Sequence, residues 1–279
     1  MKHANNKLCE GKIDDLMENL RRMHGVVVAF SGGIDSSLVT ALAYKALGLK
    51  ALAITIDSPL MPSGDLDDAK RTAREIGIEH MILGLNELDI PDFSTNPPNR
   101  CYLCKRFRFE KLKEKAIGKG FETVADGTNL SDLREYRPGL KAAKKLGIYS
   151  PLLEAGLSKE DTRMMGDLLG LPTAAKPASP CLATRIPYGH PLEQAKLERI
   201  DRAEGYIRIL TGVKVLRVRD HGNLARIEVN QDENDLLLRA GVLRQISQNL
   251  MQLGYDFVTL DLEGYRTGSF DKKFENKKE

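Results

Sequence analysis

Three of the four cysteines stand where thiols could bind a metal or react. Cys101 and Cys104 form a Cys-x-x-Cys pair after the segment NPPNR, and Cys181 lies in a proline-rich stretch. Because these surroundings are polar, the three thiols are not expected to be core residues. Cys9 lies in a polar N-terminal arm and is interpreted as an ordinary structural residue.

Three chemistries suit such a set of thiols. Three thiolates are typical of a 4Fe-4S cluster with one open iron, which could bind a substrate ligand or a sulfide. Structural zinc would need a fourth ligand, for which His80, His190 or Cys9 is available. A redox pair is disfavoured, because the thioredoxin-type motif opens a helix in a different β-α-β context, whereas we expect Cys101 and Cys104 in a loop.

A second group of residues suits phosphate binding. The stretch Ser31-Gly32-Gly33-Ile34-Asp35-Ser36-Ser37 follows the apolar run 26–30 and opens a helix. Glycines let the backbone approach a ligand, and free N–H groups at a helix start attract anions. The stretch lacks the lysine of a Walker loop. We expect Asp35, and Asp126 in the later loop Asp126-Gly127-Thr128-Asn129, to orient Mg²⁺ against a polyphosphate.

The elements that must position these residues alternate between strands and helices. Apolar runs at 26–30, 52–56, 80–83 and 121–125 suit buried strands, and helical patterns cover 11–24, 35–47, 65–76 and 105–119. This alternation predicts an α/β fold with a doubly wound parallel sheet. A second, smaller α+β domain follows, with helices at 192–210 and 233–253 and strands at 213–219, 224–230 and 256–262. A capping box at Ser158 and Asp161 predicts another helix start.

The domain boundaries follow from changes in composition. We expect a nucleotide-binding domain over 1–172, a proline-rich linker carrying Cys181 over 173–190, a small domain over 191–270 and a charged tail over 271–279. The 42 Lys and Arg nearly balance the 39 Asp and Glu, so bulk nucleic-acid binding is not expected. Neither a secretory signal nor a membrane-spanning run is found, so a cytoplasmic protein with reduced thiols is expected.

The motifs together resemble a known family. SGGIDSS after VVVAF is similar to the PP-loop of the ATP pyrophosphatases. With NRCYLCKRF, DGTNLSDLREYRPG and PCLATRIPYG in this order, roughly residues 11–265 resemble the LarE family of ATP-dependent sulfur transferases. The resemblance implies MgATP binding by the PP-loop and by 126–129, with Thr55, Ile56 and Asp57 beside the adenine. It also implies adenylation of pyridinium biscarboxylic acid mononucleotide, in the biosynthesis of the nickel-pincer nucleotide cofactor.

The family has two sulfur chemistries. In one, a cysteine at the position of Cys181 gives up its own sulfur and becomes dehydroalanine. In the other, three cysteines hold a 4Fe-4S cluster that carries an extra sulfide. Because Cys101, Cys104 and Cys181 are all present, the resemblance implies the cluster type, reloaded by a sulfide or persulfide donor. These three cysteines and Asp35 are the candidate catalytic residues.

The resemblance also implies roles for residues of the second domain. The substrate phosphate is expected to meet Arg185, Arg217 and Arg219, since a guanidinium fork suits phosphate. A further metal ion is expected at Glu204, Glu228 and Asp235. A homo-oligomer is implied as well. The alternatives are a tRNA thiolation enzyme of the same superfamily, an amidotransferase or NAD-synthetase-like ligase, and a zinc-stapled nucleotide-binding protein.

Overall fold

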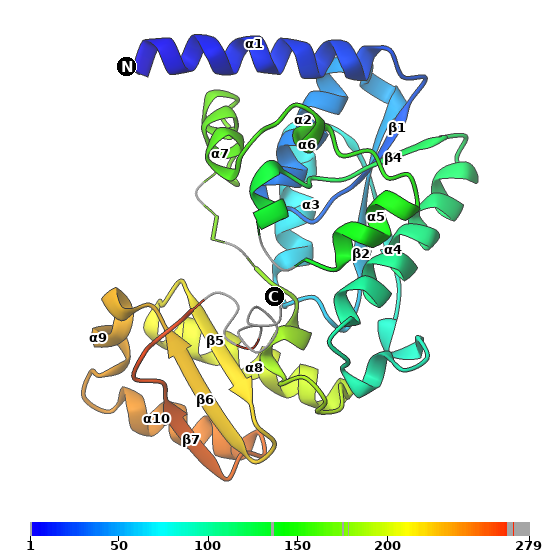
Figure 1. Cartoon of the computed structure of the whole chain (residues 1–279). Coiled ribbons are helices and arrows are strands. Elements are labelled where there is room, and N and C mark those ends of the chain that lie inside the picture. The colour runs from blue at the N-terminus through cyan, green and yellow to red at the C-terminus, as the bar shows by residue number, and fades with distance from the viewer. Residues whose placement is uncertain (1, 135–136, 175, 178, 267–269, 271–279) are drawn as a thin grey trace, which may run out of the picture. The chain divides into compact units, whose positions relative to one another are not determined.

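A computed structural model describes residues 2–134, 137–174, 176–177, 179–266 and 270, with side chains from residue 11 onward. The expected charged tail 271–279 and the side chain of Cys9 lie outside this description. The chain forms two compact units. The first consists of 1–58, 64–85 and 101–179, and the second of 59–63, 86–100 and 180–279 (Figure 1).

A four-stranded parallel sheet organises the first unit. Its order is β3-β2-β1-β4, and its strands are β1 (Val26–Ala29), β2 (Ala51–Asp57), β3 (Glu79–Gly84) and β4 (Thr123–Ala125). The helices of this part of the chain are α1 (Lys2–Arg21), α2 (Ile34–Leu47), α3 (Asp65–Ile76), α4 (Arg100–Ile117), α5 (Gly139–Lys145), α6 (Pro151–Glu154) and α7 (Lys159–Leu168). The predicted doubly wound α/β fold is confirmed.

Both faces of this sheet are covered, which explains the unbroken apolar run of β1. Val26 and Val28 pack into a core with the apolar side chains of α1, α2 and α7. Val27 points the other way and packs with Phe109 and Leu112 of α4. Alternate residues of a strand face opposite sides, so a strand between two helical layers needs apolar residues at every position.

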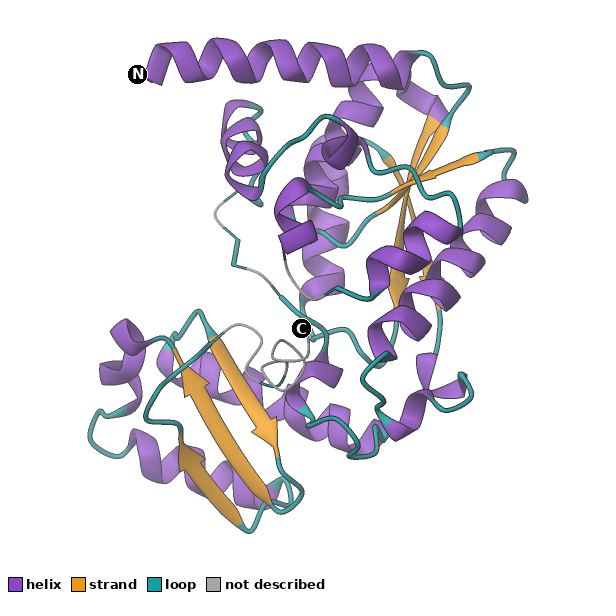
Figure 2. Ribbon diagram, viewed as in Figure 1, coloured by secondary structure: helices purple, strands orange, loops and turns teal. Residues whose placement is uncertain are grey.

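The second unit is built on a three-stranded mixed sheet. Strand β5 (Leu216–Asp220) pairs antiparallel with β6 (Leu224–Val229), and β6 pairs parallel with β7 (Phe257–Leu260). The helices are α8 (Gln194–Thr211), α9 (Asn234–Leu237) and α10 (Val242–Gln252) (Figure 2). The core includes side chains from all three helices and from the sheet. The predicted smaller α+β fold is confirmed.

Two local predictions were wrong. The Cys-x-x-Cys pair does not lie in a loop but in the first two turns of α4, because the turn at 98–99 leads directly into a helix that starts at Arg100. The expected helix 233–253 is two helices, since Gly241 adopts φ 82° and begins α10 after a break. In contrast, the capping box at Ser158 and Asp161 is present.

No helix within the described residues combines the length and the apolar character needed to span a bilayer.

Candidate functional site

The glycine-rich loop between β1 and α2 has the geometry of an anion cradle. Gly32 adopts φ +71°, and a Cβ there would lie 3.0 Å from Cα of Ala69, so the turn requires glycine. The Ser36 hydroxyl accepts the Ser31 amide at 3.2 Å and lies 3.1 Å from the Ser31 hydroxyl. The hydroxyl of Ser37 is buried and has no hydrogen-bond partner among the residues that the structure describes. An orphaned hydroxyl in the first turn of a helix fits a bound phosphate oxygen.

The loop after β4 packs directly against this cradle. A Cβ on Gly127 would lie 2.6 Å from the amide nitrogen of Ser36, so only glycine allows this approach. Asp126 accepts hydrogen bonds from the hydroxyls of Thr128 at 2.6 Å and Ser150 at 2.7 Å. The structure therefore brings together two loops that lie about 90 residues apart in the sequence.

A lysine that was not predicted as a site residue lies beside these two loops. Lys159, the first residue of α7, forms an ion pair with the carboxylate of Asp35. The other oxygen of Asp35 accepts the Asn129 amide at 3.1 Å. The signal was present in the sequence, because the capping box at Ser158 and Asp161 fixes where α7 begins and so where Lys159 lies.

The end of β2 lies beside the cradle, and its residues differ in exposure. The hydroxyl of Thr55 is fully buried, donates to the carbonyl of Phe30 at 2.7 Å and lies 2.8 Å from Nε2 of His80. Ile56 is buried, and Asp57 is exposed. Burial and the nearby Lys70 cation lower the pKa of His80, so its ring is neutral at pH 7. His80 therefore supports the strand end through its contact with Thr55.

The cysteines occur in two settings. In the first unit, Cys101 and Cys104 are half-buried and one helical turn apart on α4. In the second unit, Cys181 precedes the 3-10 helix η5 (Leu182–Arg185), and its carbonyl accepts from the Thr184 hydroxyl at 2.7 Å. All three are thiols without a disulfide. A Cys-x-x-Cys pair at the start of a helix is compatible with a redox role as well as with metal binding.

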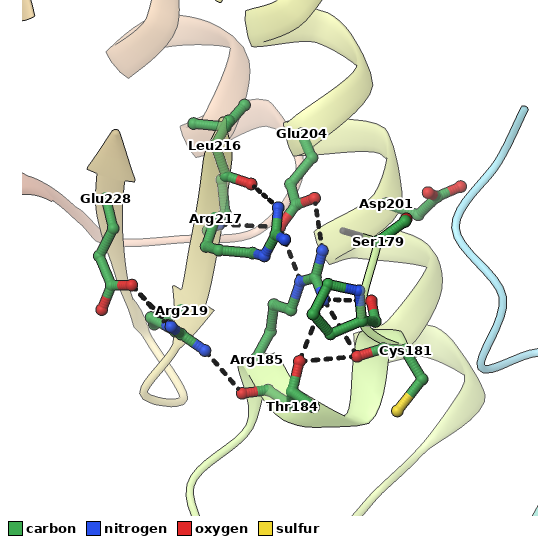
Figure 3. Close-up of polar contacts among 12 residues, drawn as sticks. Ser179, Cys181, Thr184, Arg185, Asp201, Glu204, Leu216, Arg217, Arg219 and Glu228 are labelled. Atoms are coloured by element: carbon green, nitrogen blue, oxygen red, sulfur yellow. Dashed lines mark hydrogen bonds and ion pairs between the residues drawn. The ribbon is translucent and has the colours of Figure 1, made fainter. Parts of the chain in front are cut away.

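The guanidinium of Arg185 joins the Cys181 segment to Glu204 of α8, within the second unit (Figure 3). It is fully buried and donates to both carboxylate oxygens of Glu204, at 2.9 and 3.0 Å. It also donates to the carbonyls of Pro180 and Cys181, at 2.5 and 3.0 Å. Burial opposes the charged forms, but the mutual attraction of the pair raises the pKa of Arg185 and lowers that of Glu204.

Arg217 and Arg219 lie beside this pair on β5, and both are almost fully buried. Arg219 donates to Glu228 at 2.7 Å and to the carbonyl of Thr184 at 2.8 Å. Burial and the neighbouring Arg185 cation lower the pKa of Arg217 to about 10. The arginines outnumber the carboxylates that they face, so this region would attract an anion.

The carboxylates expected to bind a further metal ion face arginines or solvent. Glu204 faces Arg185 and Arg208, Glu228 faces Arg219 and Arg226, and Asp235 is exposed in the first turn of α9. In the part of the chain that is described, no three His, Cys, Asp or Glu side chains gather as a metal-binding group. The roles of these carboxylates and of the three cysteines as metal ligands therefore stay predictions.

The chain is similar to several known proteins. Residues 8–96 match the family model described as NAD synthase. An uncharacterised protein of Synechocystis sp. is 43% identical over 93% of this chain and 98% of its own length. A tRNA-specific 2-thiouridylase of Desulfitobacterium hafniense is 32% identical over only 41% of this chain and 36% of its own.

A further relative covers nearly the whole chain and carries a functional name. The pyridinium-3,5-bisthiocarboxylic acid mononucleotide synthase of Lactiplantibacillus plantarum is 36% identical over 91% of both chains. The match spans the PP-loop, the loop at 126–129 and the arginine-rich second unit, whose geometry is given above. With this identity over this length, the chain belongs to the family of that synthase, the LarE family.

Proposed function

We propose that this protein is an ATP-dependent sulfur transferase that makes the thiocarboxylate of a pyridinium biscarboxylic acid mononucleotide, in nickel-pincer cofactor biosynthesis. The observation that carries the proposal is the 36% identity over nine tenths of both chains to the synthase named for the bisthiocarboxylic product. Two features of the molecule support it: the paired loops of the first unit and the buried arginines of the second.

The first step is the activation of a carboxylate by ATP. The amides and hydroxyls at the start of α2 would hold the pyrophosphate end of MgATP, with the unpartnered hydroxyl of Ser37 as a further donor. A substrate carboxylate oxygen attacks the α-phosphorus, and pyrophosphate leaves with the bridging oxygen. Lys159 and Asn129 hold the carboxylate of Asp35 at this corner. From there Asp35 would orient Mg²⁺, as Asp126 would from the facing loop.

The second step is sulfur transfer to the acyl-adenylate. Sulfide attacks the acyl carbon, AMP leaves, and a thiocarboxylate remains. The mononucleotide phosphate would be held by Arg217, whose guanidinium is buried among like charges and is stabilised by an added anion. Arg185 and Arg219, which pair with Glu204 and Glu228, would act with it.

Three thiolates suit an iron–sulfur cluster with one open iron, whereas a structural zinc ion needs a fourth ligand. Cys101 and Cys104 lie one turn apart on one helix, a spacing that suits two ligands of one site, and neither is in a disulfide. When bound, such a cluster would supply the sulfide on its open iron. The sacrificial alternative needs only Cys181 and leaves dehydroalanine, so it allows one turnover per chain.

The test is an anaerobic assay of iron, acid-labile sulfide and visible absorbance, with a Cys→Ala variant at each position. We expect each of the changes at Cys101, Cys104 and Cys181 to abolish the iron–sulfur band, and Cys9→Ala, the matched control, to leave it intact. Stoichiometric zinc without labile sulfide would rule out the cluster and favour a zinc-stapled protein.

A parallel assay separates the remaining functions. Incubation with MgATP, sulfide and the biscarboxylic mononucleotide should release AMP and pyrophosphate and yield a thiocarboxylate, detected by mass spectrometry. Turnover beyond one per chain excludes the sacrificial chemistry. ATP binding without release of pyrophosphate would refute an enzymatic role. Thiolation of tRNA, with binding that falls steeply as salt rises, would favour the tRNA enzyme instead.

A further inference from the structure

The chain that follows β7 continues along β6, within the second unit. The amide of Asp261 donates to the carbonyl of Ile227 at 2.8 Å, and the amide of Tyr265 donates to the carbonyl of Val229 at 2.8 Å. Between them, Gly264 adopts φ +68°, and a Cβ there would lie 2.7 Å from the Val229 carbonyl oxygen. The turn therefore requires glycine, and it fixes where Tyr265 lies.

The sheet of this unit has a charged face opposite its core. Leu216 and Val218 of β5 pack into the core, so the residues that alternate with them point to the other face. Two residues of β6 stand directly opposite those residues in the register and share that face. These four residues, which we call the arginine face, are Arg217, Arg219, Arg226 and Glu228.

Two aromatic side chains that follow β7 lie over guanidinium groups of the arginine face. The guanidinium carbon of Arg217 lies 5.1 Å from the centre of the Tyr265 ring. The centre of the Phe270 ring lies 5.1 Å from the guanidinium carbon of Arg219 and 5.9 Å from that of Arg226. These distances are within the range of cation–π contacts.

An aromatic ring affects a guanidinium differently from a carboxylate. A carboxylate neutralises the cation and accepts from its N–H groups, whereas a ring contacts the flat side of the group and adds no negative charge. Tyr265 is half-buried, so its ring shields one side of the Arg217 guanidinium from water. Because water screens charges, a shielded cation attracts an anion more strongly than an exposed one does.

We propose that Tyr265 is a positioning residue of the site for the substrate phosphate. Its ring fixes the plane of the Arg217 guanidinium, whose N–H groups bind the phosphate, and Phe270 acts in the same way on Arg219. The rings contact the arginines, so they act on the substrate through those arginines. This inference rests on the proposed function, which assigns the phosphate of the mononucleotide to Arg217 and Arg219.

The test is titration calorimetry of the full-length protein with two ligands, nicotinic acid mononucleotide and nicotinic acid riboside, which lacks the phosphate. Tyr265→Leu should weaken mononucleotide binding about tenfold, the effect of losing a cation–π contact to a guanidinium that is shielded from water. Tyr265→Phe keeps the ring and should bind the mononucleotide within about twofold of the wild type. Riboside binding should be unchanged in both variants.

A second variant displaces the ring without changing it. The Cβ of Gly264→Ala would strike the Val229 carbonyl, so the turn that carries Tyr265 must shift. Mononucleotide binding should again weaken, and riboside binding should not. This variant keeps the inference testable even if Tyr265→Leu fails to fold.

The matched control is another tyrosine that lies over an arginine of the same unit. The Tyr255 ring centre lies 4.1 Å from the guanidinium carbon of Arg199, and its hydroxyl donates to Asp220 at 3.0 Å. Tyr255→Phe should lower the melting temperature, because Asp220 loses a buried hydrogen bond, and should bind the mononucleotide within about twofold of the wild type. A merely structural role for Tyr265 would give this same pattern in Tyr265→Leu.

The outcomes separate the two proposals. Equal mononucleotide binding in the wild type, Tyr265→Leu and Gly264→Ala would overturn the positioning role and leave the proposed function intact. A wild type that binds the riboside as tightly as the mononucleotide would overturn the phosphate site and the positioning role together. The expected losses of binding in the variants, with no thiocarboxylate formed by the wild type, would overturn the proposed function alone.

Discussion

Replacement of Glu204 by alanine tests whether the buried charge cluster holds the second unit together. The carboxylate is fully buried and meets Arg185 at 2.9 and 3.0 Å, Arg208 at 2.9 Å and the amide of Val218 at 3.0 Å. Its removal leaves the fully buried Arg185 without a carboxylate partner and the amide without an acceptor. Arg217 is buried beside Arg185, and without the Glu204 carboxylate the repulsion between these two cations would increase.

The expected cost follows from these contacts. Removal of one partner from a buried ion pair costs about 3–5 kcal/mol. An orphaned buried amide adds about 1–3 kcal/mol, although the two effects share one cavity and do not add fully. We therefore expect Glu204→Ala to lower the free energy of unfolding of the second unit by at least about 3 kcal/mol at pH 7. Glu198→Ala, on the same helix and exposed, should stay within about 0.5 kcal/mol of the wild type.

The measurement is urea denaturation of the full chain, with hydrogen exchange to locate the loss in α8 and β5. The effect must also depend on pH. The folded pKa of Glu204 lies below its unfolded value, so its contribution is present above about pH 4.3 and is lost as the pH falls through the folded pKa. The difference in the free energy of unfolding between the wild type and Glu204→Gln should therefore become smaller as the pH falls through that range. A loss under about 1 kcal/mol, or a gap that widens on acidification, would refute the reasoning.

Three further predictions concern the first unit. Gly127→Ala should weaken MgATP binding at least about tenfold in titration calorimetry, because its Cβ would strike the start of α2, whereas Gly84→Ala meets no atom within 4 Å and should bind normally. Lys159→Gln should lower pyrophosphate exchange about tenfold through loss of the Asp35 ion pair, and normal exchange would show that the pair is dispensable. The ring of His80 should titrate below pH 6.5 in NMR spectra, because burial disfavours its charged form, and a normal midpoint would contradict its buried contacts.

Sequence patterns predicted a local structure correctly where a single interaction determines that structure. The apolar run of β1 and the capping box at Ser158 were read correctly, because burial on both faces and end-capping leave direct marks in the sequence. The start of α4 and the break at Gly241 were missed. Both depend on how a short turn continues into a helix, which periodicity does not reveal.

By itself, the sequence determined the α/β class, the two loops that suit a nucleotide and the three thiols outside the core. Each of these follows from residue type and local spacing. Only the tertiary structure decided that Lys159 pairs with Asp35, that Arg185 is buried against Glu204 and that Arg100 is buried with its guanidinium on Asn96. Such pairings join segments that are distant in the chain, and the sequence does not show whether a charged residue is exposed to water or buried. Burial removes the hydration of a charged side chain, so its free energy in the folded protein depends on which partner it meets.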